Sequence, residues 1–218
     1  GEGVVKDITE ALEWLKRGAE ADNPYSQMRL GDSYLAGQGV ERSKAEAEKW
    51  YERAMTNLEH QRLLRLGNNY LFGNGVERNL VTSFKNFAET AKEGNAEGQF
   101  RVGDALYKGL GIPKNKRDGI QWYSKAANKG NIFAKHALAQ AYFNGDGIRQ
   151  DRLKALEMLE EAADEGHIDS LFALGQLYLQ GDFVEKNIIK AFTLFVKAAK
   201  QGDANSQYDV GLFLKTGM

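Results

Sequence analysis

Seven glycines lie at intervals of 36 residues, and most of them open a G-x-G phrase of the kind that can hold a phosphate. They are Gly1, Gly37, Gly73, Gly109, Gly145, Gly181 and Gly217. The phrases read GEGV, GQGV, GNGV, GLGI and GDGI, and the sixth reads GDFV. Nucleotide-binding loops need a preceding strand and a third glycine or a Gly-Lys-Ser/Thr ending, and no copy has them. We therefore predict that the glycine pairs are turns between helices.

The other residues that could do chemistry do not form a constellation. The three histidines, His60, His136 and His167, fall at different positions of the 36-residue unit, and no H-E-x-x-H zinc motif occurs. The chain also has no cysteine, no G-x-S-x-G and no Ser-x-x-Lys sequence. We therefore expect no enzymatic activity, no catalytic residue, no cofactor and no metal.

Charge and hydropathy argue against two further classes of ligand. The chain has 29 basic and 30 acidic residues, a formal net charge of -1, so it has no electrostatic attraction for nucleic acid. It contains no apolar run of about 18 residues, so this segment should not insert into a membrane. We expect no nucleic-acid partner, no membrane insertion of this segment and a monomeric chain.

A period of 36 residues is typical of tandem helical repeats. Each copy has two apolar stripes with helical spacing, and the first is represented by Ala47, Trp50, Tyr51 and Ala54. The second stripe carries a Leu-Gly pair in three copies, at Gly31, Gly67 and Gly175. A glycine inside a helix costs about 1 kcal/mol relative to alanine. We predict that the neighbouring helix, which bears the tryptophan, packs too closely there for a larger side chain.

The pattern A-x-x-W-[YF]-x-x-A-A-x-x-G-[ND]-x-x-A-Q-x-x-L-G-x-x-Y-x-x-G-x-G-V resembles the Sel1-like repeat, a relative of the tetratricopeptide repeat, over essentially the whole chain. The resemblance implies an all-α fold, a right-handed α-solenoid of antiparallel helix pairs. In this frame, residues 1–218 form a single array and are a fragment of a longer protein. The helix pairs span 24–59, 60–95, 96–131, 132–167 and 168–203, with single helices at 8–21 and 204–216.

Three copies depart from this pattern. Asn86 stands where Trp14, Trp50 and Trp122 stand in other copies, and Phe183 replaces the second glycine of its turn. Leu58 replaces the glycine that ends the first helix of most copies. We therefore expect the junction between the second and third repeats to be looser or differently bent.

The helix with the Leu-Gly pair lines the concave surface in the family's relatives, and such surfaces bind partners. Its exposed positions, compared copy by copy, form three columns of corresponding residues. One column is apolar, one consists partly of arginines and one is polar. The candidate partner-binding residues are Met28, Arg29, Asp32, Leu64, Arg65, Asn68, Phe100, Arg101, Asp104, His136, Gln140, Phe172, Gln176 and Tyr208. Arginines on successive repeats could hold carboxylates of an extended peptide.

Two alternatives remain open for these columns. The apolar column could belong to the buried stripe of the helix. Arg29 with Asp32, and Arg101 with Asp104, could form solvated ion pairs at i, i+3.

The resemblance implies a scaffold or adaptor that binds a protein or peptide partner, as a bacterial host-interaction or envelope factor in the periplasm or outside the cell. One alternative is a structural subunit of a larger complex without a soluble ligand. Exposed apolar patches on the convex face would favour it. A cell-wall-associated enzyme is a further alternative, and it would need convergent carboxylates that the columns do not supply.

Overall fold

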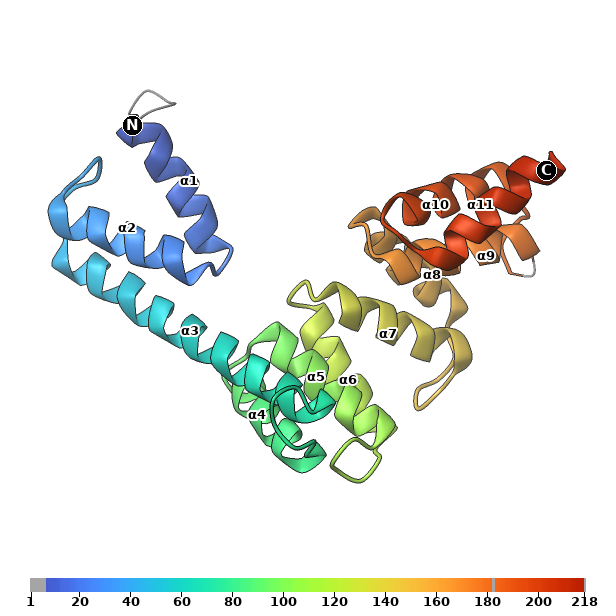
Figure 1. Ribbon diagram of the computed structural model, residues 1–218, viewed down its shortest axis with the longest axis horizontal. Helices are drawn as coiled ribbons and strands as arrows, with labels where there is room; N and C mark the ends of the chain where they lie inside the picture. Colours follow the sequence, from blue (N-terminus) through green and yellow to red (C-terminus); the bar gives the residue numbers. More distant parts are fainter. Residues whose placement is uncertain (1–6, 182, 218) are drawn as a thin grey trace. The chain divides into compact units, whose positions relative to one another are not determined.

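The computed structural model describes residues 7–181 and 183–217, and every regular element in these ranges is an α-helix (Figure 1). The predicted all-α class is confirmed. The first glycine pair, Gly1 and Gly3, lies outside the described residues. The helices are α1 (Ile8–Glu20), α2 (Pro24–Ala36), α3 (Lys44–Phe72), α4 (Leu80–Lys92), α5 (Ala96–Lys108), α6 (Lys116–Ala127), α7 (Ile132–Asn144), α8 (Arg152–Asp164), α9 (Ile168–Gln180), α10 (Ile188–Lys200) and α11 (Ala204–Thr216).

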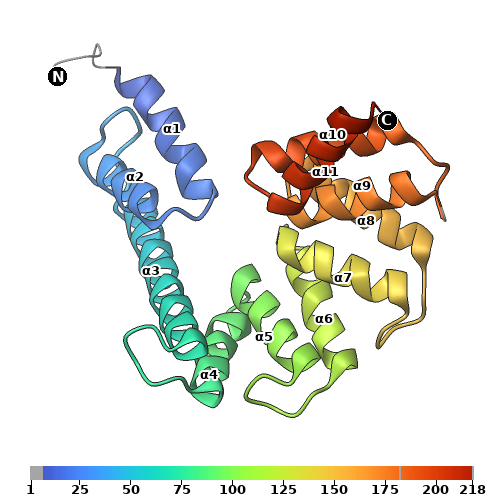
Figure 2. The same ribbon diagram turned by 45° about the vertical axis from the view of Figure 1, so that its right-hand side comes forward.

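The helices group into two compact units, and the boundary between the units falls within α3. The first unit extends to Leu66 and contains α1, α2 and most of α3. The second unit begins at Gly67, and within it each helix from α4 to α11 packs against the next one along the chain (Figure 1, Figure 2). Contact between sequential neighbours is the packing expected of a solenoid.

Four glycines of the second stripe, three of them in Leu-Gly pairs and Gly103 after Val102, face an aromatic ring of the following helix. A Cβ atom added at these glycines would lie 2.4 to 2.7 Å from the ring. The pairs are Gly31 with Tyr51, Gly67 with Phe87, Gly103 with Tyr123, and Gly175 with Phe195. The predicted close approach is confirmed, although the ring belongs to the residue after the tryptophan position. In α7, Ala139 replaces the glycine and packs in one cluster with the smaller Leu159.

The glycine pairs form turns, as the sequence predicts. Gly109 ends α5 with a φ of 81° and donates its N–H to the carbonyl of Ala105, as a left-handed helix cap does. Gly111 has a φ of 75°, and a Cβ atom there would lie 2.2 Å from the carbonyl oxygen of Leu80. Only glycine fits this turn without a shift of the backbone.

The structure differs from the repeat frame at α3, which runs unbroken through the predicted boundary at 59/60. Four of the corresponding helices end at a left-handed glycine, such as Gly94 with a φ of 86°, and the first ends at the left-handed Asp22. Leu58 occupies this position, and a residue with a side chain pays about 1–2 kcal/mol in the left-handed conformation. The helix therefore continues instead of turning.

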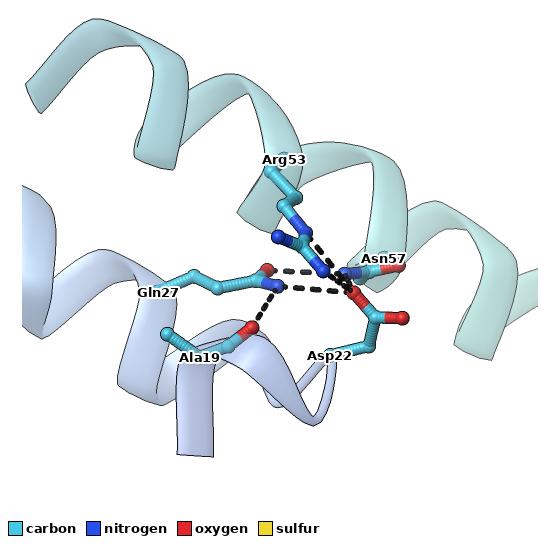
Figure 3. A network of polar contacts seen from close by, with 5 residues as sticks. All are labelled: Ala19, Asp22, Gln27, Arg53 and Asn57. Atoms are coloured by element: carbon cyan, nitrogen blue, oxygen red, sulfur yellow. Dashed lines mark hydrogen bonds and ion pairs between the residues drawn. The ribbon is translucent and has the colours of Figure 1, made fainter. Parts of the chain in front are cut away.

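In the first unit, a polar network joins the α1–α2 corner to α3 (Figure 3). Asp22 has a φ of 60°, and its Oδ1 accepts hydrogen bonds from Arg53 (2.6 Å) and Asn57 (3.3 Å). The buried Gln27 donates to the carbonyl of Ala19 and accepts from Asn57. Partial burial acts to raise the pKa of Asp22, but the hydrogen bonds from these side chains outweigh it and lower that pKa. The network thus favours the charged carboxylate.

Candidate partner-binding face

The second unit carries three recesses in a row along α5, α7 and α9, which we call the α5–α7–α9 face. The central recess has a volume of about 280 Å³ and lies among α5, α7 and the start of α9. One neighbour, of about 570 Å³, shares Asp104 and Lys108 with it. The other, of about 260 Å³ between α7 and α9, shares Gln140. Because adjacent recesses share residues, they form one continuous surface.

The second unit brings several of the predicted site residues to this face. Phe100, Asp104, His136 and Gln140 line the central recess, Arg101 and Asp104 line the larger neighbour, and Gln176 lines the recess beside α9. These residues come from three different helices, so a single partner could contact them together.

Three other candidates of the second unit do not line these recesses. Phe172 packs on the ring of Phe195, with 5.7 Å between ring centroids, so it belongs to the apolar packing of its repeat. Tyr208, on α11, is 68% exposed. Asn68 is half-buried, and its Oδ1 atom is enclosed without a hydrogen-bond partner.

The remaining candidates belong to the first unit. Met28, Arg29 and Asp32 lie on α2, and Leu64 and Arg65 lie on α3 before the boundary. Arg29 pairs with Asp32 at 3.4 Å, and both side chains are exposed. This is the solvated i, i+3 pair that the sequence left open, and such pairs contribute little to stability.

The alternative pair between Arg101 and Asp104, which the sequence allowed, does not form. Arg101 instead donates its Nε–H to Glu97 at 2.7 Å, one helical turn earlier. Asp104 pairs with Lys108 at 2.7 Å and accepts a hydrogen bond from the hydroxyl of Tyr123 at 3.1 Å. Each of the two therefore pairs with an oppositely charged residue four positions away along the helix.

The hydroxyl of Tyr123 remains a donor at all ordinary pH values. Burial raises the pKa of Tyr123, and the negative charge of Asp104 raises it further. Tyr107, which also lines the central recess, donates to Asp146 at 2.6 Å, and burial together with this bond raises its pKa to about 12. Both tyrosines therefore act as fixed structural donors and do not supply acid–base chemistry near pH 7.

A buried histidine pair forms the floor between α7 and α9. His136 is only 8% exposed, and its Nδ1 lies 2.9 Å from the hydroxyl of Ser170. His167 caps the start of α9 by accepting the N–H of Ser170 on its own Nδ1, in place of the asparagine found in other copies. Burial, together with the neighbouring imidazole of His167, lowers the pKa of His136 to about 4. Both rings are therefore neutral near pH 7.

Phe133 and Asp169 also line the central recess, and neither is among the candidate residues expected from the sequence. Both stand in the first turn of their helices, outside the three columns, and Phe133 is 53% exposed. The sequence does contain a signal for Phe133. The corresponding positions of the two preceding copies hold the polar residues Gln61 and Glu97. A large apolar residue at a position that is charged or polar in neighbouring copies marks a local role.

Within residues 7–181 and 183–217, no three histidine, cysteine, aspartate or glutamate side chains are grouped closely enough to hold a metal ion. None of the helices in the same ranges is long and apolar enough to cross a membrane.

Comparisons with known proteins agree with this architecture. The structure of c5321, a protective antigen of uropathogenic Escherichia coli with an SLR fold, matches with a TM-score of 0.64 and 31% identity. The match covers 96% of this chain but only 45% of c5321. A Sel1 repeat protein from Oxalobacter formigenes matches with a TM-score of 0.66 and 28% identity, over 94% of this chain and 84% of that one. No curated protein gives a significant match.

The family model for the Sel1 repeat matches residues 1–23, 24–55, 63–95, 96–131, 132–167 and 168–203. These six segments contain almost all of the helices described above, including both members of most pairs. The chain therefore belongs to the Sel1 repeat family, whose members are generally non-catalytic scaffolds for protein interactions.

Proposed function

We propose that this chain is a non-enzymatic scaffold that binds a protein or peptide partner through the α5–α7–α9 face. The observation that carries the proposal is the continuous row of three recesses, which share residues and together follow three successive repeats. The face combines an exposed aromatic residue, Phe133, with polar groups such as Gln140 and Asp104. Exposed aromatic residues among polar groups are characteristic of binding interfaces.

The likeness to c5321 supports a narrower proposal about the kind of partner. That protein is a protective antigen of a pathogenic bacterium, and this chain spans less than half of its length. We propose that the present array is also from a bacterial protein, and that it contacts a host or envelope protein.

A photo-cross-linking experiment tests the binding face. Benzoylphenylalanine placed at Gln140 should give a cross-link to a partner protein that excess unmodified chain prevents. The same probe at Glu157, an exposed residue of α8, is the control and should not give that product. With the partner purified, Gln140→Trp should weaken binding at least tenfold without lowering the melting temperature. Equal cross-linking from both positions, or unchanged affinity in Gln140→Trp, would contradict the proposal.

A second candidate, a structural subunit of a larger complex, is favoured by apolar residues on the even-numbered helices. Val81, Leu153 and Ile189 occupy the same position in the first turns of α4, α8 and α10, and they are 51%, 70% and 81% exposed. If this row is an assembly surface, Leu153→Ser with Ile189→Ser should abolish association with the complex. Gln140→Trp should then leave that association intact.

A further inference from the structure

The central recess has aromatic walls. The rings of Phe100 and Phe133 are stacked, with 6.0 Å between centroids and 29° between planes. The rings of His167 and Phe133 are nearly perpendicular, with 5.2 Å between centroids and 85° between planes. Since Phe133 remains 53% exposed, much of its surface is open to a ligand.

One tautomer of the histidine pair gives a hydrogen bond at each of its three contacts with Ser170. His167 Nδ1 accepts the N–H of Ser170, so it carries no proton. Its contact with the Ser170 hydroxyl, at 3.0 Å, is then a hydrogen bond only if the hydroxyl donates. With the hydroxyl proton directed to His167, the 2.9 Å contact of the same hydroxyl with His136 Nδ1 has His136 as its donor. In this tautomer His136 is protonated on Nδ1, and its Nε2 is an acceptor.

His136 Nε2 has no partner among the residues that the structure describes. The side chain is more than nine-tenths buried and lines the central recess. This nitrogen is not among the enclosed side-chain atoms that lack a partner, so solvent reaches it. A donor placed in the recess by a ligand would replace water at this acceptor.

One carboxylate near this acceptor is not paired with a cation. The central recess is lined by Asp104, Asp169 and Lys108, and an adjoining recess of about 430 Å³ adds Glu165. Lys108 pairs with Asp104 at 2.7 Å and Lys135 pairs with Glu165 at 2.6 Å, so these two carboxylates are neutralised. Asp169 has no ion-pair or hydrogen-bond partner in residues 7–181 and 183–217, and it is exposed at the mouth of both recesses. The recess therefore combines acceptors, negative charge and an open ring.

We propose that the central recess binds an arginine side chain of the partner, with the guanidinium paired to Asp169 and donating to His136 Nε2 while it stacks on Phe133. This inference rests on the proposed scaffold function and specifies the chemistry of the partner. A guanidinium is planar, offers five donors and accepts none, so it suits acceptors that surround an aromatic face. A lysine ammonium makes point contacts and cannot stack in this way.

The intact chain can be tested with a minimal probe. N-acetyl-arginine-N-methylamide, added to the protein in an NMR titration, should shift the ring signals of His136, His167 and Phe133 and saturate with a Kd on the order of 1 mM. The citrulline analogue has nearly the same shape without the charge, and it should bind at least about fivefold more weakly. Equal binding of the two probes, or shifts confined to other residues, would overturn the inference.

Two variants that make the same change in net charge distinguish binding in the central recess from nonspecific electrostatic attraction. Asp169→Asn should weaken binding of the arginine probe about fivefold, because it removes the one free carboxylate of the recess. Glu157→Gln on α8 should leave the affinity unchanged. Melting temperatures of both variants should match that of the unmodified chain, which shows that they fold. Unchanged affinity in Asp169→Asn would overturn the inference.

The outcomes also distinguish this inference from the scaffold proposal. If a partner cross-links at Gln140 and binds Asp169→Asn as tightly as the unmodified chain, the arginine pocket is wrong and the scaffold stands. If the arginine probe binds as described but no partner cross-links at Gln140, the pocket stands and the scaffold proposal fails.

Discussion

The ring of Tyr123 lies against the backbone of α5 at Gly103, so that a Cβ atom added to Gly103 would be 2.7 Å from Cδ1 of the ring. Such a distance forces the ring or the helix to move. We expect Gly103→Ala to lower the free energy of unfolding by about 1–2 kcal/mol, because overpacking outweighs the gain of about 1 kcal/mol that alanine brings to a helix. Urea unfolding followed by circular dichroism measures the change.

Gly211 provides the matched control for this substitution. It occupies the same position of the repeat on α11, but no atom would lie within 4 Å of a Cβ there. Gly211→Ala should therefore stabilise the chain by about 0.5–1 kcal/mol. Tyr123→Leu added to Gly103→Ala copies the Ala139 and Leu159 arrangement, and should recover part of the loss. Two alanine variants with equal effects would show that the ring contact is not the cause.

The helices could be predicted because the signals that define them are local. Glycine at a left-handed position and a capping side chain such as Asn95 or Asn131 recur in most copies, so their spacing locates the helix ends. α3 shows the limit of this reasoning. The replacement of the capping glycine by Leu58 indicated an altered junction. Whether the chain turns there or continues as a helix depends on which of the two conformations has the lower free energy.

The candidate site was less predictable because it depends on side-chain choices across helices. Asp104 and His136 were selected from their positions, yet Phe133 and Asp169 were not, since the first turn of a helix projects into the recess only after the helices pack. The spacing of Arg101 also allowed two carboxylate partners, and only the packed structure decides between them.

Acid should destabilise the second unit through His136. Burial, together with His167, lowers the pKa of His136 from 6.5 to about 4, so the unfolded chain binds a proton more readily than the folded one. The stabilisation is complete above pH 6.5 and is lost as the pH falls toward 4. We expect a loss of at most about 3 kcal/mol over this window. Urea unfolding at a series of pH values measures it.

His136→Phe is the control for this pH dependence. Phenylalanine occupies the same position of the repeat at Phe100 and Phe172, so its size suits the site. The variant should show a flatter stability profile between pH 6.5 and 4. A profile as steep as that of the unmodified chain would assign the acid sensitivity to other groups.

In the first unit, Asp22 and Arg53 should be coupled only weakly. Their ion pair is 2.6 Å long, but the side chains are 63% and 44% exposed, so water screens the interaction. A double-mutant cycle with Asp22→Asn and Arg53→Gln should give a coupling energy of about 0.5–1 kcal/mol, and less at 1 M salt. Asparagine tolerates the left-handed backbone conformation that Asp22 adopts, so Asp22→Asn removes the charge without straining the backbone. A coupling above 2 kcal/mol would contradict this view.

The unbroken course of α3 should depend on Leu58 and its neighbour. Leu58→Gly with Glu59→Asn restores the Gly-Asn pair that stands between helices at Gly94 and Asn95, where glycine is left-handed and asparagine caps the next helix. We expect this double variant to end the helix near residue 58, with backbone chemical shifts at 58–60 that leave the helical range. Met55→Gly, at an exposed position of the same helix, carries the same intrinsic cost of about 1 kcal/mol. It lacks the following cap, and the helix should continue through it. If shifts at 58–60 stay helical in the double variant, residues beyond the cap hold α3 straight.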